Sequence, residues 1–230
     1  MSQAQPAPRK KSVAKQAIVI LVLICLGSGG GVGFVYWRMK AEMEAKAANA
    51  FHSALAAVLG EAQNYPTVGV YPEGTKPEDE VYVSNGPSGV FYAAMGQAQG
   101  YSSFIKVLVS VEAPAPKQPV GENAVIHALV VADSNETPGL GENVKAVRKT
   151  VSIWAKLGGK EAEGAGPPSM PWFQEQFTGK ALADLIVVRQ KQTDKIAAIT
   201  GATITSNAVC QAARQAIQKI IEKTKEAYPQ

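Results

Sequence analysis

The chain has 230 residues, a net charge of +4 and a hydrophobic fraction of 46%, which suits one ordinary domain in addition to an apolar N-terminal segment. Four basic residues precede that segment, at Arg9, Lys10, Lys11 and Lys15, and the other 19 basic residues balance the 19 acidic ones. The basic pI therefore comes from the N-terminal tail and is poor evidence for nucleic-acid binding.

The N-terminal residues predict a membrane anchor. Residues 17–37 contain no charged side chain, and about 20 helical residues cross a hydrocarbon core of about 30 Å. Tyr36 and Trp37 close the segment, where aromatic rings favour the membrane interface. A cleavable signal peptide is the alternative, but its apolar core is usually about 7–15 residues long.

The charges around this segment predict its orientation. The basic residues of the tail, residues 1–16, place the N-terminus in the cytoplasm by the positive-inside rule. We expect this tail to be disordered. The C-terminal domain is then expected on the periplasmic side of the inner membrane, as part of a single-pass protein.

The remaining chain predicts a helical stalk and one α+β domain. Residues 38–60 contain strong helix formers and no proline, and Gly60 ends the run. Residues 61–230 are expected to form the domain, beginning with a loop over 61–80. We expect strands over Val81–Val83, Val90–Met95, Phe104–Val111, Ala124–Ala132, Leu182–Val188 and Ile196–Ile199, and helices over Glu142–Leu157 and Ser206–Ala227.

The isolated cysteines and histidines point to no site of their own. Cys25 lies in the apolar segment and Cys210 near the C-terminus, without a Cys-x-x-Cys pair, so we interpret both as apolar filler. His52 on the stalk is expected to be solvated, and His127 on a strand to be structural. No spacing of His, Asp, Glu or Cys predicts a metal site.

The start of the last helix is the candidate site. Thr200, Thr203, Thr205 and Ser206 bring four hydroxyls to a helix N-terminus, where free N–H groups and the helix dipole favour a phosphate. Thr205 or Ser206 is the expected N-cap residue. A plain Ser/Thr-rich cap is the alternative interpretation. A threonine hydroxyl without an activating base is a poor nucleophile, so catalysis by threonine alone is not favoured.

Two motifs in this chain resemble those of FMN-binding domain proteins. Thr200-Gly201-Ala202-Thr203 is similar to their [Ser/Thr]-Gly-Ala-Thr flavinylation motif. The run Glu136-Thr137-Pro138-Gly139-Leu140-Gly141, about 60 residues upstream, is similar to their Glu-Thr-x-Gly-Leu-Gly loop. Gly100-Tyr101 and the aromatic segment from Trp172 to Gly179 resemble further positions of the family.

The resemblance implies a covalent flavin. In these proteins the last threonine of the motif carries FMN through a phosphodiester bond made by a separate flavin transferase, which assigns this role to Thr203. The remaining cofactor-binding residues that the resemblance implies are Thr200, Gly201, Ala202, Thr205, Glu136, Thr137, Gly139, Leu140 and Gly141. Trp172, Phe173 and Phe177 could pack beside the flavin or in the core. Ala197 stands where the family often has Asp, and Asp194 is the nearest upstream acidic residue.

The resemblance also implies a role in electron transfer. The G subunit of Rnf complexes is favoured, as a non-autonomous relay between reduced ferredoxin and NAD⁺ that is coupled to sodium or proton movement. The flavin subunit of a sodium-pumping NADH:quinone reductase and a non-redox membrane-tethered assembly module are the alternatives. The expected partners are the other subunits of a membrane redox complex, the flavin transferase and the membrane. No Gly-x-Gly-x-x-Gly motif for NAD itself occurs.

Overall fold

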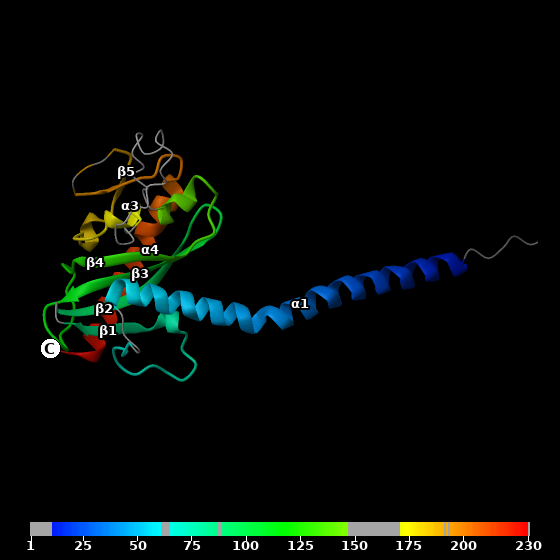
Figure 1. Cartoon of the computed structure of the whole chain (residues 1–230), viewed down its shortest axis with the longest axis horizontal. Coiled ribbons are helices and arrows are strands. Elements are labelled where there is room, and N and C mark those ends of the chain that lie inside the picture. Colours follow the sequence, from blue (N-terminus) through cyan, green and yellow to red (C-terminus); the bar gives the residue numbers. More distant parts are fainter. Residues whose placement is uncertain are drawn as a thin grey trace, which may run out of the picture. The chain divides into compact units, whose positions relative to one another are not determined.

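The computed structural model describes residues 11–60, 65–86, 89–146, 171–190, 192 and 194–229. Within them the chain divides into two units after Asn49. Residues of both units belong to the first helix, α1 (Lys11–Leu59) (Figure 1).

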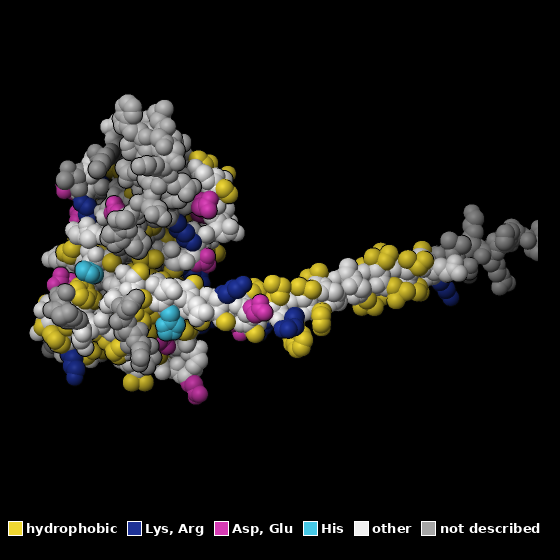
Figure 2. Space-filling model, in the orientation of Figure 1, with side chains coloured by type: hydrophobic (Ala, Val, Ile, Leu, Met, Phe, Trp, Pro, Cys, Tyr) yellow, Lys and Arg dark blue, Asp and Glu magenta, His cyan; other side chains and the backbone are white. Residues whose placement is uncertain are grey.

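The first unit contains the expected apolar helix. Among the described residues, one helix is long and apolar enough to cross a membrane, and it lies between Lys15 and Leu59. Its large apolar side chains from Ile18 to Trp37 are exposed, and charged side chains follow them along α1 (Figure 2). Because α1 begins at Lys11, residues 11–16 are helical, and the expectation of disorder there is wrong.

A four-stranded antiparallel sheet is the centre of the second unit. Its strands are β1 (Val81–Gly86), β2 (Gly89–Gln99), β3 (Phe104–Ala113) and β4 (Ile126–Asp133), in the order β1-β2-β3-β4. All four expected strands are confirmed, and each extends beyond its predicted C-terminal end. The ladder between β2 and β3 runs from Val90 opposite Ala113 to Gln99 opposite Phe104, so residues 100–103 form the hairpin turn.

Helices cover both faces of this sheet. The long helix α4 (Thr203–Ala227) runs behind the strands and the last turns of α1 run in front of them (Figure 1). Along β2, Tyr92 and Ala94 face the α4 side, whereas Phe91 and Ala93 face α1. Burial on both faces explains why the strands are almost continuously apolar.

The last turns of α1 therefore belong to the domain and not only to a stalk. Ala54, Leu55, Val58 and Leu59 are buried against the sheet, and the helix ends before Gly60, whose φ is +83°. This spacing of apolar residues gives α1 a buried stripe over its last turns. His52 is exposed, as expected.

Short elements complete the second unit. They are the 3₁₀ helices η1 (Pro77–Asp79), η2 (Gly141–Lys145) and η3 (Leu182–Asp184), the helix α3 (Trp172–Glu175), and the parallel strands β5 (Val187–Val188) and β6 (Ile196–Ala197). Of the strand expected over Leu182–Val188, only the last two residues form a strand. Of the strand expected over Ile196–Ile199, only the first two residues do.

The helix expected over Glu142–Leu157 is wrong where the structure describes it. Residues 141–145 form η2, and Ala146 has an extended conformation, with φ −75° and ψ 124°. The Val144 carbonyl accepts a hydrogen bond from Nε2 of Gln174 at 2.9 Å, a tertiary contact that ties η2 to α3. Residues 147–157 lie outside the described residues.

Several side chains with open interpretations belong to the core. Phe173 and Phe177 are fully buried, with ring centroids 5.6 Å apart, and Trp172 is partly buried beside them. Cys210 is buried and free, and burial raises the pKa of its thiol to about 12, which makes it an inert apolar side chain. His127 is exposed, and its ring lies 4.3 Å from the ring of Phe91.

Candidate functional site

The N-terminus of α4 lies three residues earlier than expected. Ala202 is the N-cap residue, and its carbonyl accepts the first helical hydrogen bond from the Ser206 amide at 2.9 Å. The amides of residues 203–205 therefore precede the helical hydrogen-bond ladder and remain available as donors in the first turn.

Neither Thr205 nor Ser206 is the cap, so that prediction is wrong. The Ser206 hydroxyl accepts a hydrogen bond from the Ile199 amide at 3.0 Å and donates one to the Ala202 carbonyl at 2.9 Å. Buried Ser206 thus fastens the segment that follows β6 to the first turn of α4. This contact fixes the position of the turn that bears the threonines.

A glycine turn leads from β6 into α4. The Ala202 amide donates to the Ile199 carbonyl at 2.9 Å, and Gly201 has φ +79°, a conformation that side chains disfavour. A Cβ atom on Gly201 would lie 3.0 Å from Cδ2 of Leu140. Gly201 therefore permits both the turn and the close approach of the Leu140 loop.

A pocket of about 480 Å³ lies beside this turn. Its walls come from the β2–β3 turn, from the loop after β4 and from the start of α4. The lining residues are Tyr101, Glu136, Thr137, Leu140, Gly141, Gly201, Ala202, Thr203, Ile204 and Thr205. The exposed Thr203 side chain belongs to this lining, on the first turn of α4.

Most of the expected site residues meet at this pocket. Thr200 and Gly139 do not line it, although Gly139 shapes the loop with φ +75°. Ile204 lines the pocket although the sequence did not predict it, and Tyr101 lines it in addition to resembling a family position. Ile204 lies off the apolar stripe of α4 and is 55% exposed, and an apolar residue outside the buried stripe is the sequence signal that could have found it.

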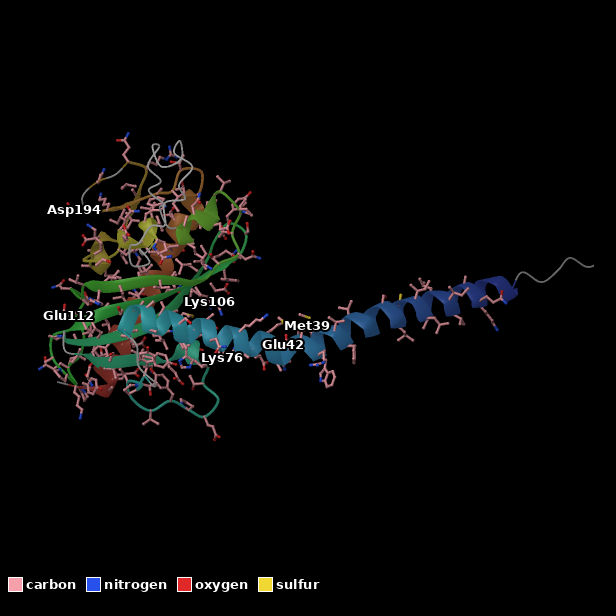
Figure 3. All side chains as sticks on the ribbon, viewed as in Figure 1. Met39, Glu42, Lys76, Lys106, Glu112 and Asp194 are labelled. Atoms are coloured by element: carbon pink, nitrogen blue, oxygen red, sulfur yellow. The ribbon has the colours of Figure 1, made fainter. Side chains whose placement is uncertain are left out.

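Asp194 and Ala197 lie apart from the pocket lining. Asp194 is exposed on the segment between β5 and β6 (Figure 3). The Ala197 amide donates to Oε1 of Gln176 at 2.9 Å, so this position is held through its backbone. Neither residue is among those that line the pocket.

Glu136 is the best-connected polar residue of the site. Its side chain is buried, with 6% of the residue exposed. Oε1 accepts from the amides of Ser102 and Ser103 at 3.0 and 3.1 Å and from the Ser103 hydroxyl at 3.4 Å. Oε2 accepts from the Tyr101 amide at 3.2 Å and from the Thr205 hydroxyl at 2.7 Å.

These hydrogen bonds favour the ionised form of Glu136. Burial raises the pKa of this carboxyl, but the hydrogen bonds from Thr205, Ser103, Ser102 and Tyr101 outweigh it and leave the pKa below its ordinary value. Three successive amides that converge on one carboxylate form an anion-binding nest. The site therefore contains a fixed negative charge.

The pocket offers what a flavin nucleotide needs. Free amides of the α4 first turn suit a phosphate, and Thr203 offers an exposed hydroxyl next to them. Tyr101, Leu140 and Ile204 present exposed apolar surface of the kind that an aromatic ring system covers. Among the described residues no group of His, Cys, Asp and Glu side chains is arranged to hold a metal ion.

Comparison with known proteins identifies the domain. The sequence model of the FMN-binding domain matches residues 100–218, which include all of the pocket-lining residues. The chain belongs to the FMN-binding domain family. The structure and this assignment confirm the α+β fold that the sequence pattern predicted, and the assignment supports FMN as the cofactor.

Two curated relatives carry names from one kind of complex. The chain is 32% identical over 151 residues to the G subunit of the Na(+)-translocating ferredoxin:NAD(+) oxidoreductase complex of Acetobacterium woodii, a match that covers 62% of this chain and 56% of the relative. It is 27% identical over 201 residues to the G subunit of the proton-translocating ferredoxin:NAD(+) oxidoreductase complex of Clostridium ljungdahlii, a match that covers 87% and 88%. The resemblance to the G subunit of Rnf complexes is thereby confirmed.

Proposed function

We propose that this chain is the flavin subunit of a membrane-bound, ion-translocating ferredoxin:NAD oxidoreductase of the Rnf type, with FMN joined to Thr203 by a phosphodiester bond. The observation that carries the proposal is Thr203 itself, exposed in the pocket lining on the first turn of α4 within an FMN-binding domain. The two relatives, which are both named as G subunits, support membership of such a complex.

Each part of the pocket has a role in this proposal. The Thr203 hydroxyl is the attachment point, and a separate flavin transferase supplies the activation that the hydroxyl lacks. The amides of residues 203–205 stabilise the phosphate charge. Thr137, Leu140 and Gly141 form the wall that comes from the loop after β4, and Thr200, Gly201 and Ala202 shape the acceptor turn. When bound, FMN supplies one- and two-electron redox chemistry.

The chain acts as a carrier and not as an independent enzyme. The protein holds and orients the flavin, while electrons arrive from and leave to other subunits. A covalent tether keeps the cofactor in place without relying on binding affinity. The apolar segment of α1 anchors the chain in the inner membrane, and the basic residues before it favour a cytoplasmic N-terminus and a periplasmic domain.

The attachment is tested by mass spectrometry of the full chain made together with its flavin transferase. We expect the intact mass to exceed that of the polypeptide by FMN minus water, and a flavin-fluorescent band to survive denaturing electrophoresis. Both signals should be lost in Thr203→Ala and kept in Thr178→Ala, which removes an exposed threonine outside the motif. An unmodified Thr203 peptide in the wild-type chain would contradict the proposal and favour a non-redox assembly module.

The orientation is tested by labelling in intact cells. A single cysteine introduced at the exposed position Thr178, in a chain without its two natural cysteines, should react with a membrane-impermeant maleimide added outside the inner membrane. Labelling only after the inner membrane is opened would place the domain in the cytoplasm and contradict this part of the proposal.

A further inference from the structure

One carboxylate connects the three walls of the pocket. The walls come from segments that are far apart in sequence, around Tyr101, Glu136 and Thr205. Glu136 on the middle segment accepts hydrogen bonds from both of the others, across 33–35 positions on one side and 69 on the other. Beside it, the hydroxyls of Ser102 and Thr137 lie 3.2 Å apart and add a second link between the same segments.

The hydrogen bonds of Glu136 are directed to the protein itself. Five donor atoms from the turn and from α4 approach its two oxygens, and they fill the roughly four lone-pair sites of a carboxylate. Among the described residues no lysine or arginine forms an ion pair with it. A carboxylate that is occupied in this way fixes the positions of its donors and has little capacity left for a cofactor.

Two glycines, Gly100 and Gly141, lie so close to the Glu136 side chain that a Cβ atom on either would overlap it. A Cβ atom on Gly100 would lie 2.5 Å from Oε1 of Glu136. A Cβ atom on Gly141 would lie 2.8 Å from Oε2 of Glu136 and equally far from Oγ1 of Thr205. A Cβ atom at either position would therefore force the Glu136 side chain to shift, so the two glycines are consistent with a close-fitting contact here.

We propose that Glu136 is the positioning residue of the flavin site. Its carboxylate holds the Tyr101–Ser103 turn and the first turn of α4 against the loop of residues 136–141, and so keeps the attached flavin ordered in the pocket. The inference rests on the proposed function for the flavin, whereas the fixing of the walls by Glu136 does not.

The first test uses the full chain loaded with flavin by its transferase, in detergent, with Glu136→Gln compared to wild type. We expect the intact mass of Glu136→Gln to show that the flavin is still attached. The attached flavin should lose most of its visible circular dichroism, its fluorescence anisotropy should fall, and its midpoint potential should shift toward that of free FMN. Glu142→Gln is the matched control, because Glu142 is an exposed carboxylate on the same segment. It should leave all three signals unchanged.

The second test uses the flavin-free full chain and needs no cofactor. Hydrogen exchange of the amides of residues 101–103 should become faster in Glu136→Gln and stay unchanged in Glu142→Gln, because the first variant alone weakens the acceptor of these amides. Unchanged exchange in Glu136→Gln overturns the inference whether or not flavin is attached to Thr203. A wild-type chain that is never flavinylated contradicts the proposed function alone.

A milder variant covers the case in which Glu136→Gln does not fold. Thr205→Val keeps the side-chain shape and removes one hydroxyl donor at 2.7 Å, while the four other hydrogen bonds remain. We expect a smaller loss of flavin dichroism and faster exchange of the Ser206 amide, the first hydrogen-bonded amide of α4. Wild-type values of both in a folded Thr205→Val chain overturn the inference.

Discussion

At the scale of single residues, the pocket beside Thr203 combines a short local motif with contacts between segments that are far apart in sequence. Thr203 and Gly201 belong to a short local motif, so their proximity follows from the sequence alone. The role of Glu136 does not, because its partners in the turn before β3 lie 33–35 positions away and most are backbone amides that any residue provides. Hydroxyl side chains favour the N-cap position, which is why the sequence predicts a cap at Thr205 or Ser206. The Ser206 hydroxyl instead contacts Ile199 and Ala202 from within the first turn of α4.

Glu136 should make the stability of the domain sensitive to acid. Its folded-state pKa lies below the ordinary value of 4.5, so the stabilisation is present above that value and is lost as pH falls through the folded-state pKa. We expect the free energy of unfolding of the flavin-free chain to decrease as the pH falls below about 5, with a shallower decrease in Glu136→Gln. Urea unfolding at several pH values measures both slopes.

At neutral pH, Glu136→Gln should lower the free energy of unfolding by about 1–3 kcal/mol, because the NH₂ group of glutamine cannot accept hydrogen bonds from the buried donors. Glu142→Gln should keep the wild-type pH dependence, since its carboxylate is exposed. Equal acid sensitivity of Glu136→Gln and wild type would show that other carboxyls control acid unfolding.

At the scale of elements, the sequence succeeded where hydrophobic patterns were long. Strands β2 and β3 have ten or eleven residues, and their predicted starts are nearly correct. Strands β5 and β6 have two residues each, too few for periodicity to define their bounds. The spacing of Val144, Val147 and Val151 predicts a helix, but the tertiary contact of Gln174 with the Val144 carbonyl is invisible in such a pattern.

The contact between β2 and α4 should depend on one glycine. A Cβ atom on Gly96 would overlap the Ala212 carbonyl and lie 2.8 Å from the Ala216 amide, both on α4. Gly96→Ala should therefore destabilise the flavin-free chain by about 1–3 kcal/mol, as overpacking does. Denaturant unfolding monitored by circular dichroism measures the change.

Gly121→Ala is the matched control for that substitution. Nothing lies within 4 Å of a Cβ atom placed there, and its φ is not in the left-handed region. We expect a change within about 0.5 kcal/mol. If both variants unfold at the wild-type denaturant concentration, α4 does not pack on β2 as closely as described.

At the scale of the whole molecule, the main departure from expectation is where the domain begins. The sequence predicts a separate stalk over residues 38–60, because an alanine-rich run favours helix without indicating what it packs on. The division after Asn49 instead assigns the last turns of α1 to the domain. They cover Phe91, Met95 and Leu108 on one face of the sheet.

Removing these turns should expose that face. A chain that begins at Ala50 should fold to a monomer that elutes as one species, whereas a chain that begins at Tyr65 should bind a hydrophobic dye and aggregate.

Within the full chain, Leu55→Ala should lower the free energy of unfolding by about 2–5 kcal/mol, because the Leu55 side chain is only 1% exposed. His52→Ala, an exposed site on the same helix, is the control. A soluble, dye-free chain beginning at Tyr65 would contradict this boundary.

The hydrogen bonds of Glu136 also determine when the pocket forms during maturation of the protein. Its donors and acceptors are supplied by one polypeptide, so the hollow beside Thr203 takes shape when the chain folds and does not wait for its cofactor. Under the proposed attachment at Thr203, chains made before the flavin transferase is present would remain able to accept FMN. Chains stored bare and chains freshly synthesised should accept their prosthetic group at the same rate.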